Sequence, residues 1–224
     1  MTIKVALFDM DGVLYDSMPN HAQAWYDVMT SYGIDCSRED FYLHEGRTGS
    51  SMINQLYQQS LGRSASLEEQ NEIYKKKCSR FAELENAVPM QGALEVLKKV
   101  RELEIMPFLV TGSGQLSLLD RLEADFPGFF KKDMMVTAYD VVLGKPHPEP
   151  YLLGLEKAGA KPSEAIVIEN APLGVESGKA AGIYTIAVNT GPLADEVLFA
   201  AGADCVYHTM QELADNLENT INRI

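Results

Sequence analysis

The sequence predicts an α/β protein: a doubly wound, Rossmann-like parallel sheet with an inserted helical cap domain. Three observations lead to this prediction. Short apolar runs alternate with helical patterns after about residue 90, which is typical of βαβ units. The first apolar run, residues 3–8, is separated from the others by an interval of helical patterns. Acidic, amide and hydroxyl residues follow several of these runs, where open α/β sheets carry their sites.

Each expected strand is a short apolar run, and each expected helix has an apolar face. The strands of the sheet are expected at residues 3–8, 107–110, 134–136, 165–168, 185–188 and 205–207. Helices are expected at residues 115–124, 148–158, 173–181 and 211–221, and at 21–32, 50–61 and 67–84 within the interval 17–89, where no strand is predicted. We therefore assign residues 1–16 and 90–224 to the core domain and residues 17–89 to the cap, which begins just after the first strand and must lie over its end.

Composition restricts the classes of function. The 224 residues fit one large domain, or a domain with a small insert, and the net charge of −13 argues against nucleic acid or an anionic membrane as a partner. No apolar run approaches the roughly 20 residues of a membrane helix, and the N-terminus lacks a signal-peptide pattern. The three cysteines have no metal-ligand spacing, which favours a reducing compartment. We expect a cytoplasmic monomer.

Two carboxylates, Asp9 and Asp11, follow the first predicted strand at alternate positions, and Gly12 comes next. Acids crowded at one strand end repel each other unless a cation lies between them. Mg²⁺ is the simplest such cation, because it prefers carboxylate oxygens and often accompanies a phosphate. For this segment alone, a surface turn with two solvated aspartates remains an alternative. An EF-hand loop is excluded, because the glycine comes too early.

Two further segments favour an anionic ligand. Thr111-Gly112-Ser113 follows the strand at 107–110 and offers a hydroxyl and backbone N–H groups to an anion. The alternative is that Ser113 caps the following helix. Lys145 lies in a proline-flanked loop, where restricted backbone freedom fixes the direction of its ammonium toward a phosphate. An exposed, solvated lysine is the alternative here.

The strand at 165–168 ends in Glu169 and Asn170, which we expect to join Asp9 and the backbone carbonyl of Asp11 around Mg²⁺. Asn170 is also a suitable cap for the next helix. Together the strand ends supply acids, a hydroxyl, a lysine and an amide, a set that suits phosphoryl transfer. Asp9 is then the nucleophile that forms an aspartyl-phosphate, and Asp11 is the general acid and base.

These residues, in this order, resemble the haloacid dehalogenase superfamily, specifically its β-phosphoglucomutase-like phosphatase branch. The motifs that carry the resemblance are Asp9-Met10-Asp11-Gly12-Val13, Thr111, Lys145-Pro146 and Glu169-Asn170. The resemblance spans nearly the whole chain and implies a Rossmann-like core with a helical cap, obligate Mg²⁺ and a two-step reaction through phospho-Asp9. The catalytic residues that it implies are Asp9, Asp11, Thr111 and Lys145. Dehalogenation is not expected, because a dehalogenase would lack Asp11.

The chain departs from the mutase pattern at two places. The mutase usually has Glu-Asp where this chain has Glu169-Asn170, so one negative charge is missing. Glu45 and Gly49 stand where the mutase cap loop has a lysine and an arginine for the distal phosphate of the sugar. We hypothesise that Glu45 reaches the Mg²⁺ shell when the cap closes and leaves a small chamber, which favours inorganic pyrophosphate. The alternatives are that Glu45 points to solvent or pairs with Arg47.

The expected substrate is therefore a small phosphorylated metabolite or pyrophosphate, held by His21, Arg47, Gly112, Ser113 and Lys145. His21 is placed near the catalytic acid or the substrate by the resemblance to the mutase branch, with a structural role as the alternative. Two other functions stay open. A β-phosphoglucomutase would interconvert β-glucose 1-phosphate and glucose 6-phosphate, and a non-catalytic binding protein would have a degenerate site.

Overall fold

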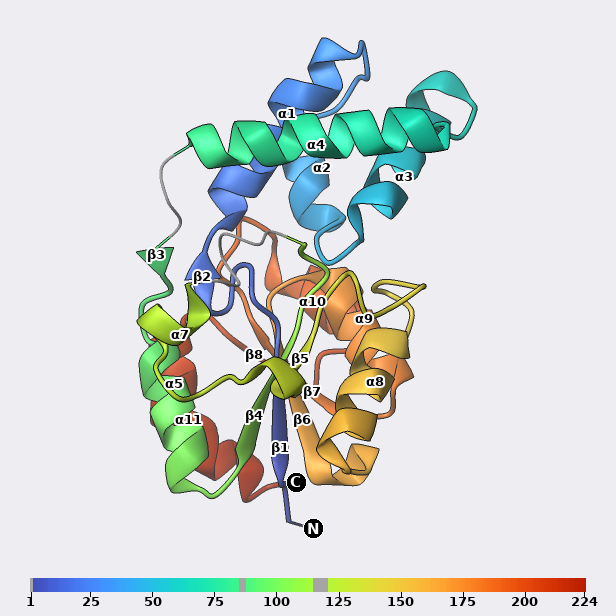
Figure 1. Ribbon diagram of the computed structural model, residues 1–224. Helices are drawn as coiled ribbons and strands as arrows, with labels where there is room; N and C mark the ends of the chain where they lie inside the picture. The colour runs from blue at the N-terminus through green and yellow to red at the C-terminus, as the bar shows by residue number, and fades with distance from the viewer. Residues whose placement is uncertain (1, 85–87, 115–120) are drawn as a thin grey trace.

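A parallel sheet forms the centre of the computed structural model, which describes residues 2–84, 88–114 and 121–224. Its strand order is β5-β4-β1-β6-β7-β8 (Figure 1). The strands are β1 (Val5–Phe8), β4 (Met106–Val110), β5 (Met135–Val136), β6 (Ala165–Glu169), β7 (Tyr184–Val188) and β8 (Cys205–Tyr207). Helices α5 (Ala93–Glu102) and α11 (Met210–Ile221) cover one face, and α8 (Glu149–Ala158) and α9 (Pro172–Ala180) cover the other. The predicted doubly wound α/β fold is confirmed.

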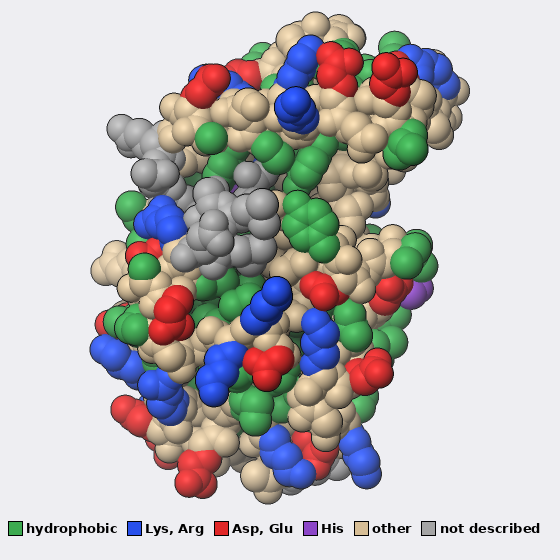
Figure 2. Space-filling view, viewed as in Figure 1, with side chains coloured by type: hydrophobic (Ala, Val, Ile, Leu, Met, Phe, Trp, Pro, Cys, Tyr) green, Lys and Arg blue, Asp and Glu red, His purple; other side chains and the backbone are tan. Residues whose placement is uncertain are grey.

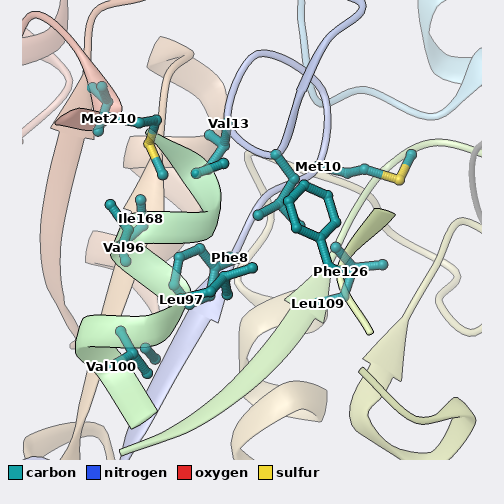
Figure 3. Packing of buried hydrophobic residues seen from close by; sticks show 14 of the residues in the cluster. Phe8, Met10, Val13, Val96, Leu97, Val100, Leu109, Phe126, Ile168 and Met210 are labelled. Carbon is teal, nitrogen blue, oxygen red and sulfur yellow. The ribbon is translucent and has the colours of Figure 1, made fainter. Parts of the chain in front are cut away.

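Strand β1 is apolar throughout because both of its faces are buried. Ala6 and Phe8 point into the cluster beneath α5 and α11, whereas Val5 and Leu7 point into the cluster beneath α8. Figure 3 shows Phe8 against Leu97 and Val100 of α5 and between the neighbouring strands. The parallel register aligns Phe8 with Leu109 on one side and with Ile168 on the other. The residues that follow these three strands therefore meet at one edge of the sheet.

Four helices, here called the helical layer, lie above this edge (Figure 1). They are α1 (Met18–Ser31), α2 (Arg38–Leu43), α3 (Gly49–Leu61) and α4 (Leu67–Glu83). The layer has a hydrophobic cluster of its own, in which the Trp25 ring stacks on Phe41 and packs near Ile53 and Leu56. Helix α4 begins with a capping box between Ser66 and Glu69, which satisfies N–H groups that the first turn leaves without helical partners. The layer is thus stabilised largely by its own side chains.

Two connections join the helical layer to the sheet, and they pair with each other. Strand β2 (Tyr15–Asp16) precedes α1, and β3 (Val88–Pro89) follows α4; the two form an antiparallel ladder. The prediction that residues 17–89 hold no strand is therefore wrong at Val88–Pro89. A two-residue strand has no periodicity of its own, and it is defined here by a partner far away in the sequence.

The other helices and strands that the sequence predicts agree with the structure to within a few residues at their ends, where such elements fray. Helices α2, α5 and α10 (Asp195–Ala200) are not among the individually predicted elements, although alternation after residue 90 is predicted. Of the predicted helix 115–124, residues 115–120 lie outside the described residues; α7 covers Leu122–Asp125. Within the described residues, no helix is long and apolar enough to cross a membrane.

Candidate active site

The predicted site residues meet at the carboxyl ends of the central strands. Asp9 and Asp11 follow β1, Thr111 follows β4, and Glu169 ends β6. Lys145 comes from the loop before α8, and Asn170 precedes α9. All of these residues are at least nine-tenths buried. The sequence predicts their places at strand ends, and the parallel register brings them together.

Lys145 links two of the carboxylates. Its Nζ atom donates to Asp9 Oδ1 at 2.5 Å, to Glu169 Oε1 at 2.6 Å and to the Val110 carbonyl oxygen at 3.0 Å. Burial lowers the pKa of Lys145, but the charges of Asp9 and Glu169 outweigh that effect and raise the pKa above its ordinary value. The ammonium therefore stays charged at neutral pH and fixes the orientation of Asp9.

The site nevertheless carries more negative than positive charge. Burial, with the repulsion of Glu169 and Asp11, raises the pKa of Asp9 to about 8 despite the opposing effect of Lys145. Burial and the nearby Asp9 also raise the pKa of Glu45 well above its ordinary value. Carboxylates that are hard to ionise together form a site for a cation, whose charge lowers these pKa values again.

Asp11 is held by a different set of groups. Its Oδ1 atom accepts a hydrogen bond from Ser17 Oγ at 2.5 Å and lies 3.1 Å from His21 Nε2. On the other side of the imidazole, Lys77 Nζ lies 2.7 Å from His21 Nδ1. An ammonium has only donors, so Nδ1 accepts and Nε2 carries the hydrogen that His21 donates to Asp11.

The pKa values in this chain of groups fit that assignment. Burial and the nearby Lys77 lower the pKa of His21, which keeps the imidazole neutral. Burial lowers the pKa of Lys77 to about 8. Burial would raise the pKa of Asp11, but the interactions with His21 and Ser17 outweigh it and lower that pKa. Asp11 is therefore the more acidic of the two aspartates, and Asp9 the less acidic.

The loop 44–49 of the helical layer places Glu45 at the edge of the site. Asn170 Nδ2 donates to Glu45 Oε1 at 2.9 Å, and Glu45 is only 8% exposed. Its carboxylate is directed to the core and not to solvent. The other amide atom, Asn170 Oδ1, is buried and has no hydrogen-bond partner among the described residues. A buried oxygen without a partner is costly, so this atom is oriented to bind a ligand.

Of the predicted substrate-binding residues, all but Lys145 line a chamber between the layer and the core: His21, Arg47, Gly112 and Ser113. The backbone N–H of Ser113 donates to Thr111 Oγ1 at 2.9 Å, so the hydroxyl hydrogen of Thr111 remains available to an anion. Arg47 donates through Nη1 to Ser51 Oγ at 3.2 Å, and its Nε is buried without a partner among the described residues. The predicted capping role of Ser113 concerns a helix start that lies outside the described residues.

The chamber is small. The volume that a water-sized sphere can reach within it is about 60 Å³. Its lining includes Asp9, Asp11, His21, Glu45, Lys77 and Thr111, and also Tyr74. The Tyr74 ring occupies the space that a side chain at Gly49 would need, because a Cβ there would come within 2.3 Å of the ring. The sequence marks Gly49 as a departure from the mutase pattern but does not reveal which side chain fills its place.

Ser17, Lys77 and Tyr74 are site residues that the sequence prediction missed; Ser17 donates to Asp11, and the other two line the chamber. Lys77 and Tyr74 lie on the predicted amphipathic helix, where a lysine and a tyrosine are ordinary residues. One signal for Lys77 was available, since it lies four residues from both Ile73 and Phe81 and therefore shares their buried face. A lysine on the apolar face of a helix is unusual enough to indicate a role.

The donor set fits a hard divalent cation, although it is not a cluster of acids alone. Among the described residues, no group of three or more His, Cys, Asp and Glu side chains is arranged to hold a metal ion. The oxygen of Asn170, the carboxylates of Asp9 and Glu45 and the backbone carbonyl of Asp11 are all hard donors. The unpartnered Asn170 Oδ1 is the observation on which this fit depends.

Comparisons with known proteins identify the family of this chain. The chain is 32% identical to hexitol phosphatase A of Escherichia coli K12 over 216 residues. The aligned region covers 95% of this chain and 94% of that protein. The chain is 34% identical over 206 residues to a phosphorylated carbohydrates phosphatase of Thermotoga maritima, covering 90% and 92% of the two chains.

A solved structure from Bacteroides vulgatus, provisionally named as a beta-phosphoglucomutase, superposes with a TM-score of 0.95 at 53% identity, covering 99% of this chain and 90% of that one. The sequence profile of the haloacid dehalogenase-like hydrolases matches residues 3–182. The match covers most of the chain and includes all of the strand-end residues described above. The chain belongs to the haloacid dehalogenase-like hydrolase family.

Proposed function

We propose that this protein is a Mg²⁺-dependent phosphohydrolase that acts through an aspartyl-phosphate on Asp9, with inorganic pyrophosphate as its favoured substrate. One observation carries the choice of substrate. The loop of the helical layer directs a carboxylate, Glu45, into the acidic site against Asn170. A sugar phosphate with a second phosphate would meet repulsion there, whereas a cation between Glu45 and the core would be stabilised.

In the first step, Asp9 attacks the phosphorus atom of the substrate. Its carboxylate is oriented by Lys145 through Oδ1. The Thr111 hydroxyl and the backbone N–H groups that follow it are suited to binding the oxygens of the transferred phosphoryl group. This arrangement supports in-line transfer to a fixed nucleophile, in which positioning and charge stabilisation supply most of the catalysis.

Asp11 serves as the general acid and base. Its lowered pKa suits the base role, in which it takes a proton from the water that hydrolyses phospho-Asp9. In the acid role it gives a proton to the oxygen of the leaving phosphate, which requires Asp11 to enter the cycle protonated. Ser17 and His21 both contact Oδ1 of Asp11 and so hold the carboxylate for these transfers. Lys77 acts through His21 by fixing its tautomer.

The groups that we propose for Mg²⁺ are Asp9, the backbone carbonyl of Asp11, Asn170 Oδ1 and Glu45, with Glu169 beside them. Mg²⁺ would neutralise the phosphate charge and the crowded carboxylates. Both carboxylate oxygens of Glu169 already accept hydrogen bonds: Oε1 from Lys145 and Oε2 from the Asn170 backbone N–H. We therefore propose that Glu169 contributes negative charge near Mg²⁺ and does not ligate it. The pKa values of Asp9 and Glu45, raised chiefly by burial, support a site that needs a cation for full ionisation.

The helical layer, residues 17–89 in our proposal, acts as the cap that sets substrate size. Tyr74 and Glu45 restrict the chamber to about 60 Å³ of reachable volume. Arg47 and Lys77, which also line the chamber, supply positive charge that a compact polyanion requires. A small chamber lined by basic side chains, beside groups that would hold Mg²⁺, favours pyrophosphate over a hexose phosphate.

Sugar phosphates are the second candidate class. The relatives named hexitol phosphatase A and phosphorylated carbohydrates phosphatase support it, as does the provisional mutase name of the Bacteroides vulgatus structure. A mutase would transfer phosphate between positions of one sugar and release little of it. The pocket geometry, with Glu45 and Tyr74 inside the chamber, favours hydrolysis of the smaller substrate.

The test is phosphate release in the presence of Mg²⁺ from a panel of pyrophosphate, β-glucose 1-phosphate, hexitol phosphates and nucleoside monophosphates. We expect kcat/KM for pyrophosphate to exceed that for the sugar phosphates by at least tenfold. An Asp9→Asn variant is the control and should release no phosphate. Equal or greater activity on hexitol phosphates would establish the sugar phosphatase, and conversion of β-glucose 1-phosphate to the 6-phosphate would establish the mutase.

A further inference from the structure

The geometry points to Tyr151 as a positioning residue: its hydroxyl orients the Glu169 carboxylate, and Glu169 in turn positions Lys145 and the Asn170 segment. Tyr151 lies in the first turn of α8, six residues after Lys145, and its side chain is completely buried. It is not among the residues that line the chamber, so its effect on the reaction must pass through other groups.

The hydroxyl of Tyr151 donates to Glu169 Oε1 at 2.6 Å, and the same oxygen accepts from Lys145 Nζ at 2.6 Å. The Lys145 ammonium also lies 5.1 Å from the centre of the Tyr151 ring. One aromatic side chain therefore contacts both members of the buried ion pair.

The rest of the Glu169 carboxylate is also confined. Oε2 accepts from the backbone N–H of Asn170 at 3.1 Å. Gly174 of α9 faces the carboxylate so closely that a Cβ at this position would come within 1.9 Å of Oε1. Tyr151 and Lys145 donate to Oε1, the Asn170 backbone N–H donates to Oε2, and Gly174 leaves space for the carboxylate. Each oxygen of Glu169 therefore has its own set of donors.

Two consequences follow if the Tyr151 hydroxyl is removed. Glu169 Oε1 then has Lys145 as its main partner, and the ammonium is drawn away from Asp9, which loses its fixed orientation. The carboxylate is also free to rotate, so Oε2 leaves the Asn170 backbone and takes negative charge away from the cation site. Substrate affinity should change little, because Tyr151 is not among the residues that line the chamber.

The test compares Tyr151→Phe with Tyr207→Phe and the wild type. Tyr151→Phe keeps the buried ring and removes one oxygen. Tyr207→Phe is the matched control, because the Tyr207 hydroxyl makes a 2.6 Å hydrogen bond with Thr220 Oγ1 in the core domain, away from the site. Near-UV circular dichroism and thermal unfolding check that both variants keep the native fold.

We expect Tyr151→Phe to lower kcat about tenfold with KM within twofold of wild type. We expect it to weaken Mg²⁺ binding to the metal-free protein, measured by isothermal titration calorimetry, about threefold or more. Tyr207→Phe should match the wild type in both measurements. The inference is overturned if Tyr151→Phe also matches the wild type in both, if it raises KM with kcat unchanged, or if both variants lose activity equally.

This inference rests on the proposed phosphohydrolase function for its kinetic part only. The kinetic assay uses whichever substrate in the panel has the highest kcat/KM, so an error in the choice of pyrophosphate leaves the test intact. If the wild type hydrolyses no substrate, the proposed function fails. The Mg²⁺ titration alone then tests the role of Tyr151, by comparing the Mg²⁺ affinity of Tyr151→Phe with that of Tyr207→Phe.

Discussion

Glu45 is the residue on which the proposed choice of substrate depends. Its carboxylate is buried beside Asn170 and near Asp9, and these surroundings raise its pKa well above the ordinary value, with burial as the largest cause. Burying such a group has a cost in the metal-free protein. In our proposal a cation in the site would offset this cost, so that Glu45 would favour metal binding at the expense of the stability of the metal-free protein.

The first prediction concerns Glu45→Gln and pH. Because the folded pKa of Glu45 is raised, its favourable contribution to stability is present below pH 4.5 and is lost as pH rises through the folded pKa. Metal-free wild type should therefore lose stability as the pH rises from 4.5 toward the raised pKa of Glu45. Glu45→Gln cannot ionise at this position, so its Tm should fall less than that of the wild type over the same pH range.

Thermal unfolding in chelator at several pH values measures this difference. Glu68→Gln is the control, because Glu68 is an exposed carboxylate in α4. The same Glu45→Gln protein should bind Mg²⁺ at least tenfold more weakly than wild type in calorimetry. Unaltered Mg²⁺ affinity would show that Glu45 has no part in holding the metal, whatever its effect on Tm.

The second prediction concerns Lys77, whose pKa burial lowers to about 8. Below that pH the buried ammonium is charged at a cost in stability, so Lys77→Met should raise Tm at pH 7 by about 3 °C. It should also lower kcat about tenfold, because His21 loses the donor that fixes its tautomer. Thermal unfolding and steady-state kinetics on one preparation test both expected effects, the rise in Tm and the fall in kcat. Lys76→Met, which removes an exposed neighbour, is the control; a fall in both quantities for Lys77→Met would contradict the prediction.

At the scale of elements, the contact between loop 44–49 and the strand-end loops depends on the absence of side chains. A Cβ at Gly112 would come within 2.4 Å of the Gly46 carbonyl oxygen, and a Cβ at Gly46 would come within 3.0 Å of Lys145 Cδ. Gly46 also has a φ of +88°, which disfavours any other residue. Two glycines from different elements let the loop lie directly on the core.

The third prediction follows from this contact. Gly112→Ala should separate loop 44–49 from the core, since the clash is with backbone and cannot be relieved by rotating a side chain. We expect kcat/KM to fall at least tenfold, with Tm within about 3 °C of wild type, because the two hydrophobic clusters are untouched. Steady-state kinetics and thermal unfolding measure the two effects.

Gly191→Ala provides the matched control for the third prediction. A Cβ at Gly191 would meet only Tyr42, at an ordinary contact distance of 3.5 Å. That variant should keep wild-type kinetics. Wild-type kinetics for Gly112→Ala as well would mean that loop 44–49 need not approach Gly112 during turnover.

On the scale of the whole molecule, the protein combines a net charge of −13 with a site for anions. Figure 2 shows basic and acidic side chains interspersed over the outer face of the helical layer and the core, without a basic patch on this face. The overall field therefore repels an anionic substrate, and the cations at the site must overcome it locally. A bound divalent cation is the largest local charge available for this purpose.

The fourth prediction is that Mg²⁺ stabilises the whole fold. Adding Mg²⁺ at about 100 times its Kd should contribute about 2.7 kcal/mol, which corresponds to about 5–10 °C in Tm for a chain of this length. NaCl at equal ionic strength is the control, because it screens the net charge without entering the site. An equal rise in Tm with NaCl would mean that screening, and not a specific site, accounts for the effect.

The sequence by itself determined the sheet and the residues at its edge. Each core strand is a short apolar run, and the positions that follow such runs are fixed by local periodicity and by the parallel topology that alternating elements require. That is why the amino-acid sequence alone assigns Asp9, Thr111 and Glu169 to one site. Lys145 is harder to assign from the sequence, since a loop lysine is usually solvated.

Only the tertiary structure decided what the helical layer contributes. Glu45 and Asn170 are 125 residues apart, and their contact depends on how the layer packs on the core. The same is true of Lys77 beside His21, of Tyr74 in the space beside Gly49, and of strand β3. Local sequence patterns fix secondary structure and strand ends, but contacts between independently packed layers depend on side-chain shapes that no single segment encodes.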